Sequence, residues 1–293
     1  MTNEPTVPQP IHDSVSKAYA EALRRTQQTA SGGCGCGPAC CASVVETAGY
    51  SHELDAFAEA GASSFGCGNP LAFADVQPGQ TVLDLGSGAG LDLLVAAQKV
   101  GPTGKVIGVD MTDAMIEAAR QNAERAGAHQ IVVRKGLIEA LPVEDASVDH
   151  VISNCVINLS PEKHKVFAEI ARVLKPGGQF RISDIVAETM PDVVKHHAAA
   201  YAACIAGAIS EKRYLVGLHR VGMEDVQVAS RIDYTADQIR AMVMNDFELF
   251  GADGTDLVEA FAGMAGKVAS ITVTGRKPLE RKGSCCSGGG SCC

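Results

Sequence analysis

The sequence predicts an α/β fold in which helices cover both faces of a mostly parallel sheet. Between about residues 66 and 187, short runs rich in Val, Ile and Leu alternate with amphipathic stretches of helical length. Strand and helix repeated in this way build a parallel sheet that is buried on both faces. A glycine-rich turn, residues 86–90, directly follows the first of these runs. Doubly wound folds bind ligands at such turns, so the sheet is expected to be Rossmann-like.

Each element of this region follows from the periodicity of its side chains. Runs rich in β-branched residues predict strands at 81–85, 105–110, 130–136, 148–156 and 178–186. Amphipathic stretches between them predict helices at 91–100, 112–127 and 161–174. The intervening KPGG, residues 175–178, is typical of a helix stop followed by a turn.

Composition divides the chain into four regions. Residues 1–65 hold a helix over about 11–28, with apolar positions at Ile11, Val15, Tyr19 and Leu23, and then a Cys-rich loop. Residues 66–187 form the α/β domain. Residues 188–276 are expected to form a smaller α+β unit, with a helical segment at 193–209 and strands near 226–230 and 269–275. The Gly/Ser-rich residues 277–293 predict a disordered, Cys-rich tail.

Charge and cysteine content exclude several classes of protein. The 293 residues carry a net charge of -9 and no extended basic block, so nucleic acid is not an expected partner. No run of about 18 apolar residues and no signal peptide occurs, so we expect a cytoplasmic protein without a membrane span. In a reducing compartment the eleven cysteines favour ligands or reactive thiols over a disulfide framework.

The glycine-rich turn and the following strand ends predict a binding site for a nucleoside. Gly86, Ser87, Gly88 and Gly90 would bring backbone N–H groups to the ligand. The acidic residue before them, Asp84, suits a ligand that carries an ammonium group. Further positions lie at the ends of successive predicted strands: Asp110 for a ribose diol, Met111 against a purine face, Ile138 and Glu139 at the adenine edge, and Asn154 beneath the reacting centre.

The complete set of motifs is more specific than the turn. It comprises the glycine-rich turn, the strand-end Asp110, KGLIEALP at 135–142 and LKPGG at 174–178. Together they resemble class I S-adenosylmethionine-dependent methyltransferases over about residues 66–187. The resemblance implies that S-adenosylmethionine is the cofactor.

Three cysteines lie inside the region expected to fold: Cys67, Cys155 and Cys204. Cys155 and Cys204 could each be a small buried hydrophobic residue, because unpaired cysteines are often buried, whereas Cys67 between two glycines fits that interpretation poorly. However, SFGCGNP, ISNCVINLSPEKHKVFAE and the Cys-x-x-Gly-Ala at 204–208 are similar to arsenite methyltransferases over roughly residues 40–210. By this resemblance Cys67, Cys155 and Cys204, with Cys40 or Cys41, bind trivalent arsenic in arsenite and methylarsenite, and glutathione or thioredoxin serves as the reductant.

Other interpretations of the thiols remain open. Cys34, Cys36, Cys40 and Cys41 could bind zinc, although their spacing is irregular for a structural site. The chain could also be a class I methyltransferase for a small organic acceptor, or a metalloid-binding protein without turnover. Four histidines match neither a metal-binding nor a triad spacing and are expected to be ordinary surface or cap residues: His164, His196, His197 and His219.

Overall fold

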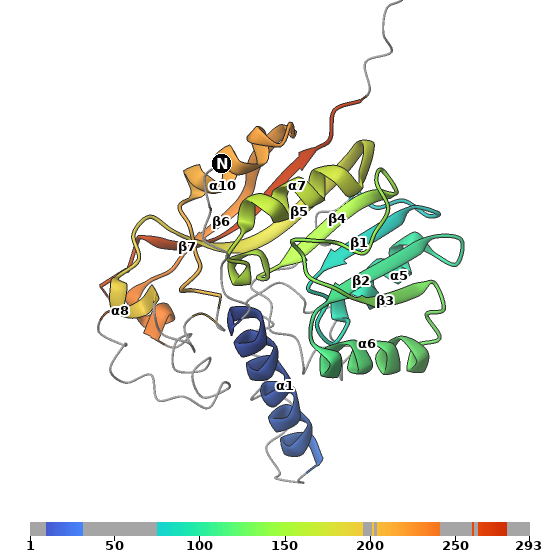
Figure 1. The fold of residues 1–293 in the computed structure, drawn as a ribbon, viewed down its shortest axis with the longest axis horizontal. Coiled ribbons are helices and arrows are strands. Elements are labelled where there is room, and N and C mark those ends of the chain that lie inside the picture. The colour runs from blue at the N-terminus through green and yellow to red at the C-terminus, as the bar shows by residue number, and fades with distance from the viewer. Residues whose placement is uncertain are drawn as a thin grey trace, which may run out of the picture.

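Seven strands form a single mixed sheet in the order β3-β2-β1-β4-β5-β7-β6 (Figure 1). The computed structural model describes residues 10–31, 75–195, 201, 204–240, 260 and 263–279. The strands are β1 Thr81–Leu85, β2 Lys105–Asp110, β3 Ile131–Lys135, β4 Val148–Asn154, β5 Leu174–Ala187, β6 Glu224–Asp233 and β7 Val268–Arg276. Strands β1 to β5 pair in parallel, whereas β7 pairs antiparallel to both β5 and β6.

Helices cover both faces of the sheet, which confirms the predicted fold class. The described helices are α1 Pro10–Ser31, α5 Leu91–Val100, α6 Asp113–Arg125, the 3-10 turn η2 Ile157–Leu159, α7 Lys163–Val173, α8 Asp192–Lys195 and α10 Glu211–Arg220. Alternate strand residues point to opposite faces. In β2, Val106 packs with α5 and α6, whereas Ile107 packs with the core beneath α7 and α10.

Helix α1 is far from the strands in sequence but packs beside the glycine-rich turn and α6 in space. Figure 1 shows it in blue beside α6. Leu23 of α1 packs with Ala89 and Met115, and Val15 packs in the cluster that contains Cys155. The apolar stripe predicted for this helix therefore faces the protein.

Two features differ from the predicted elements. The segment expected to be helical over 193–209 forms a turn at 204–207, because Cys204 has φ 61 and a positive φ cannot continue a right-handed helix. Strand β5 begins at Leu174 rather than at 178, and residues 175–178 bulge out, since the pairing with β4 passes from Leu174 directly to Gln179.

The strands expected for the smaller unit, β6 and β7, belong to the same sheet as β1 to β5. The sheet therefore extends beyond residue 188, the predicted start of that unit. Nine residues of β7 pair with β5, and β6 then pairs with β7. The division into four domains remains a prediction, and the Cys-rich loop and most of the tail lie outside the described residues. None of the helices in the described part of the chain is long and apolar enough to cross a membrane.

Candidate functional site

A pocket opens at the carboxyl ends of β1, β2 and β4. It holds about 930 Å³ of empty space, a volume that includes its open mouth. Its walls come from the glycine-rich turn, the end of β2, residues 136–139, residues 154–156, Leu159, Ser160 and α1. This is the edge at which open α/β sheets bind ligands.

The glycine-rich turn needs glycine for two different reasons. A Cβ at Gly86 would lie 2.3 Å from Cγ2 of Val156, so the turn packs directly on the segment after β4. Gly88 has φ 50, and a Cβ there would meet no atom within 4 Å among the described residues. Because Gly88 also lines the pocket, its backbone faces the space in which a ligand would lie.

Asp110 stabilises this turn in addition to lining the pocket. Its Oδ2 accepts a hydrogen bond from the N–H of Gly88 at 2.9 Å, and its Oδ1 accepts one from the N–H of Thr112 at 2.8 Å. Burial raises the pKa of Asp110, and the two backbone hydrogen bonds oppose this rise. The strand-end carboxylate thus holds the turn in the shape that a ligand would meet.

Carboxylates dominate the charge near the turn. Burial raises the pKa of Asp84 well above its usual range, and the negative charges of Asp92 and Asp110 raise it further. Asp92 and Asp110 line the pocket, whereas Asp84 lies behind the lining residues and is 2% exposed. A cationic ligand would relieve this repulsion, since an opposite charge favours the ionised carboxylate.

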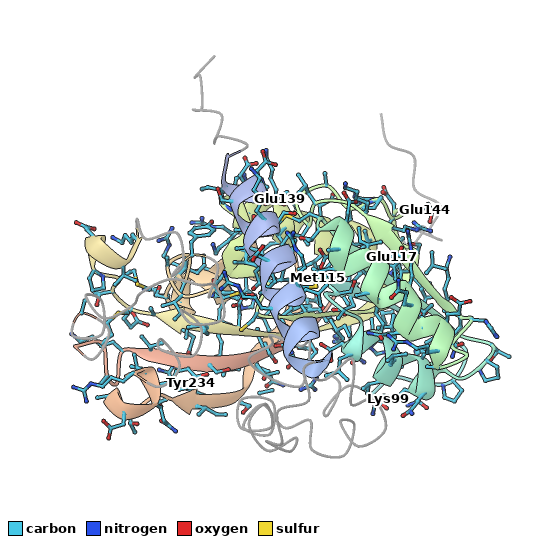
Figure 2. The ribbon with its side chains drawn as sticks, turned by 90° about the horizontal axis from the view of Figure 1, so that it is seen from below. Lys99, Met115, Glu117, Glu139, Glu144 and Tyr234 are labelled. Carbon is cyan, nitrogen blue, oxygen red and sulfur yellow. The ribbon has the colours of Figure 1, made fainter. Side chains whose placement is uncertain are left out.

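Two buried oxygen atoms of the pocket have no hydrogen-bond partner among the described residues. They are Oγ of Ser87 and Oε2 of Glu139. The other oxygen of Glu139 contacts Nε2 of His12 at 3.0 Å and accepts a hydrogen bond from Oγ of Ser160. Figure 2 shows Glu139 and Met115 beside α1. Buried polar atoms are normally satisfied, so these two oxygens are suited to a bound ligand.

The predicted nucleoside-site residues converge on this pocket, with one exception. Asp84 does not line the pocket. The residues that do line it are Gly86, Ser87, Gly88, Gly90, Asp110, Met111, Ile138, Glu139 and Asn154. Sequence reasoning missed His12, Tyr19, Asp92 and Ser160, which also line it. Tyr19 belongs to the apolar stripe of α1, and nothing in that pattern indicates which distant segment the stripe contacts.

The structure brings two of the predicted thiol residues together beside the pocket. Cys155 follows β4 and lines the pocket, and the Sγ of Cys204 donates a hydrogen bond to the carbonyl of Cys155. The hydroxyl of Tyr19 lies 3.8 Å from Sγ of Cys204. Cys155 is disulfide-bonded, whereas Cys204 is not. Cys40, Cys41 and Cys67 lie outside the described residues.

Both of these cysteines have a left-handed backbone conformation. Their φ angles are 56 for Cys155 and 61 for Cys204, a region that non-glycine residues occupy at a cost of about 1–3 kcal/mol. Such strain clusters at functional sites, where the surrounding structure holds it. The strain therefore favours a functional interpretation of these cysteines over a packing one.

This strain gives a testable result at Cys204. We expect Cys204→Gly to be more stable than Cys204→Ala by about 1 kcal/mol, because glycine adopts positive φ without steric cost. Both substitutions remove the thiol, so the comparison isolates the backbone. The measurement is chemical denaturation of the two variants, and equal midpoints with equal slopes would show that Cys204 is unstrained.

No group of three or more His, Cys, Asp or Glu side chains in the described residues could hold a metal ion. The cysteines considered for zinc, at positions 34, 36, 40 and 41, all lie outside those residues. His164 and His219 are exposed, as expected of surface histidines, while His196 and His197 are not described.

The chain is similar to known methyltransferases. A methyltransferase-domain family model matches residues 77–242. An arsenite methyltransferase of Halobacterium salinarum is 47% identical over 206 residues, covering 70% of this chain and 52% of the relative. One of Aquipseudomonas alcaligenes is 37% identical over 207 residues, covering 68% of this chain and 58% of the relative. The chain thus spans about half the length of these curated relatives.

A solved structure agrees with these matches. The crystal structure of an arsenic(III) S-adenosylmethionine methyltransferase from Chlamydomonas reinhardtii matches with a TM-score of 0.61 and 34% identity, covering 74% of this chain and 69% of that one.

Proposed function

Because the chain belongs to the family of arsenite S-adenosylmethionine methyltransferases, we propose that it methylates trivalent arsenic in arsenite and methylarsenite, using S-adenosylmethionine, as a detoxification reaction. The observation that carries this proposal is the position of Cys155 and Cys204. One lines the nucleoside-type pocket, and the thiol of the other bonds to the carbonyl of the first.

The donor fits the residues of the pocket. When bound, S-adenosylmethionine supplies an electrophilic methyl group on a sulfonium. Oε2 of Glu139 can accept from the adenine amino group, and Oγ of Ser87 is a second buried atom that needs a ligand partner. Asp110 would accept from the ribose hydroxyls with lone pairs that its two backbone bonds leave available. The carboxylates near the glycine-rich turn favour a ligand with net positive charge.

Thiolates are suitable ligands for the methyl acceptor, trivalent arsenic, because arsenic is soft. It binds three sulfurs in a pyramid, with a lone pair opposite them. Three thiols would exchange for the three hydroxyl groups of arsenite and release three water molecules. The arsenic lone pair would then accept the methyl group as its bond to the sulfonium sulfur breaks, so that S-adenosylhomocysteine leaves and As(III) is oxidised to As(V). The attacking atom carries no proton, so no general base is required. The protein contributes mainly proximity and alignment. Cys67, with Cys40 or Cys41, would complete the set of thiols.

A thiol reductant completes the reaction. Cys155 is disulfide-bonded in this structure, and only its thiolate can bind arsenic. We propose that glutathione or thioredoxin reduces this residue before arsenite binds and also supplies the two electrons that return As(V) to As(III) after each methyl transfer. We propose that the reaction takes place in the cytoplasm.

The experiment that tests the function is an assay of the purified, reduced full chain with S-adenosylmethionine and arsenite. We expect methylarsenic species that form in step with S-adenosylhomocysteine, separated by chromatography and quantified as arsenic. Arsenite binding without product would instead support a metalloid-binding protein. Absence of both would leave a methyltransferase for a small organic acceptor.

A further inference from the structure

A buried polar cluster lies next to the two cysteines but outside the pocket. Asp184 of β5 is 1% exposed. Its Oδ1 accepts from the N–H of Ile185 at 2.9 Å, and its Oδ2 accepts from the N–H of Asn158 at 3.2 Å and from the hydroxyl of Tyr214 at 3.4 Å. Burying a carboxylate is costly unless it is paired and hydrogen-bonded. None of these residues lines the donor pocket, so donor binding does not account for the cluster.

Lys163 supplies the positive charge of this cluster. It begins α7, and its Nζ donates to the carbonyls of Ser160 at 2.8 Å and Asn158 at 3.2 Å. Burial lowers the pKa of Lys163, and the negative charge of Asp184 opposes this effect. Lys165 on the same helix differs, because its side chain is 51% exposed and pairs with Glu162.

The segment that carries Cys204 packs on the same carbonyl that Lys163 contacts. A Cβ at Gly207 would lie 2.0 Å from the oxygen of Asn158 and 3.5 Å from Nζ of Lys163. The side chain of Asn158 in turn donates to the carbonyl of Ile185 on β5. Thus β5, the turn η2 and residues 204–208 meet at Asn158 and Gly207. Asn158 is three residues after Cys155, and Gly207 is three residues after Cys204.

We propose that Lys163 is a positioning residue for the arsenic site, in that its ammonium group holds η2 against the segment 204–208 and so keeps the thiol of Cys204 beside Cys155. The proposal rests on the proposed function. Lys163 acts through the backbone that it binds and takes no part in bond making. Its loss should therefore weaken binding of arsenite more than binding of the donor, because Lys163 does not line the donor pocket and contacts a lining residue only through the backbone carbonyl of Ser160.

The test compares Lys163→Met, Lys163→Arg and the control Lys165→Met in the reduced full chain. Arsenite binding is measured by equilibrium dialysis with quantification of arsenic, and S-adenosylmethionine binding by calorimetry. For Lys163→Met we expect arsenite affinity to fall about tenfold, equivalent to about 1.4 kcal/mol, and KM for arsenite to rise with it. Donor affinity should fall by clearly less than arsenite affinity. Arginine should restore most of the arsenite affinity, and Lys165→Met should match the wild type.

Wild-type arsenite affinity in Lys163→Met would overturn the proposal, as would an equal loss of donor affinity. If Lys163→Met shows no cooperative thermal transition, Lys163→Gln, which retains a polar donor, takes its place with the same criteria. Failure of the proposed function is distinguishable: wild-type protein would then bind arsenite without methylating it, and the binding comparison would still decide the role of Lys163. Wild-type protein that does not bind arsenite at all would overturn both.

Discussion

Cys155→Ser and Cys204→Ser are each expected to abolish methylation of both arsenite and methylarsenite. Arsenite can exchange three oxygens for thiolates, whereas methylarsenite keeps one carbon and binds only two. The two cysteines that meet beside the pocket would serve every methylation step. The measurement is product formation from each substrate at saturating donor, with donor affinity determined in parallel.

Cys67→Ser is the matched comparison for this result. It should abolish methylation of arsenite, which needs a third thiol, and leave turnover of methylarsenite largely intact. Cys155→Ser that retained turnover on both substrates would make the strand-end cysteine a packing residue and the thiolate mechanism wrong.

Gly88→Val is expected to eliminate donor binding. Gly88 lines the pocket, and a Cβ added there would meet no atom within 4 Å among the described residues. A branched side chain at this position would therefore project into the space where the ligand must lie. Valine at φ 50 would also strain the turn that Asp110 holds through the N–H of Gly88. Calorimetric titration should detect no binding of S-adenosylmethionine.

Gly127→Val separates backbone strain from the blocked pocket. Gly127 has φ 62, and a Cβ there would also meet nothing within 4 Å, but it follows α6 and does not line the pocket. We expect Gly127→Val to lose stability by about 1–3 kcal/mol and to bind the donor normally. Normal donor affinity in Gly88→Val, or loss of donor binding in both variants, would contradict the assignment of the turn.

Sequence periodicity was sufficient for the elements that surround the donor pocket. Strand residues alternate and helix residues recur every three or four positions, so β1, α5 and β2 could be located from local pattern alone. Because parallel strands end at one edge of the sheet, the same pattern placed Asp110 and Glu139 near one another. The hydrogen-bond partners of these two carboxylates within the protein could not be predicted. The contacts of Asp110 with Gly88 and of Glu139 with His12 depend on atomic distances.

The amino-acid sequence by itself determined the α/β class of this protein and its glycine-rich turn, because each of these is encoded in residues that are neighbours along the chain. Only the tertiary structure decided that α1 lies against the donor pocket, that β6 and β7 complete the sheet, and that Cys204 bonds to the carbonyl of Cys155. These contacts join segments separated by 49 residues in the case of the two cysteines. Packing of the whole core decides which of many compatible apolar surfaces meet. No local sequence pattern specifies that choice.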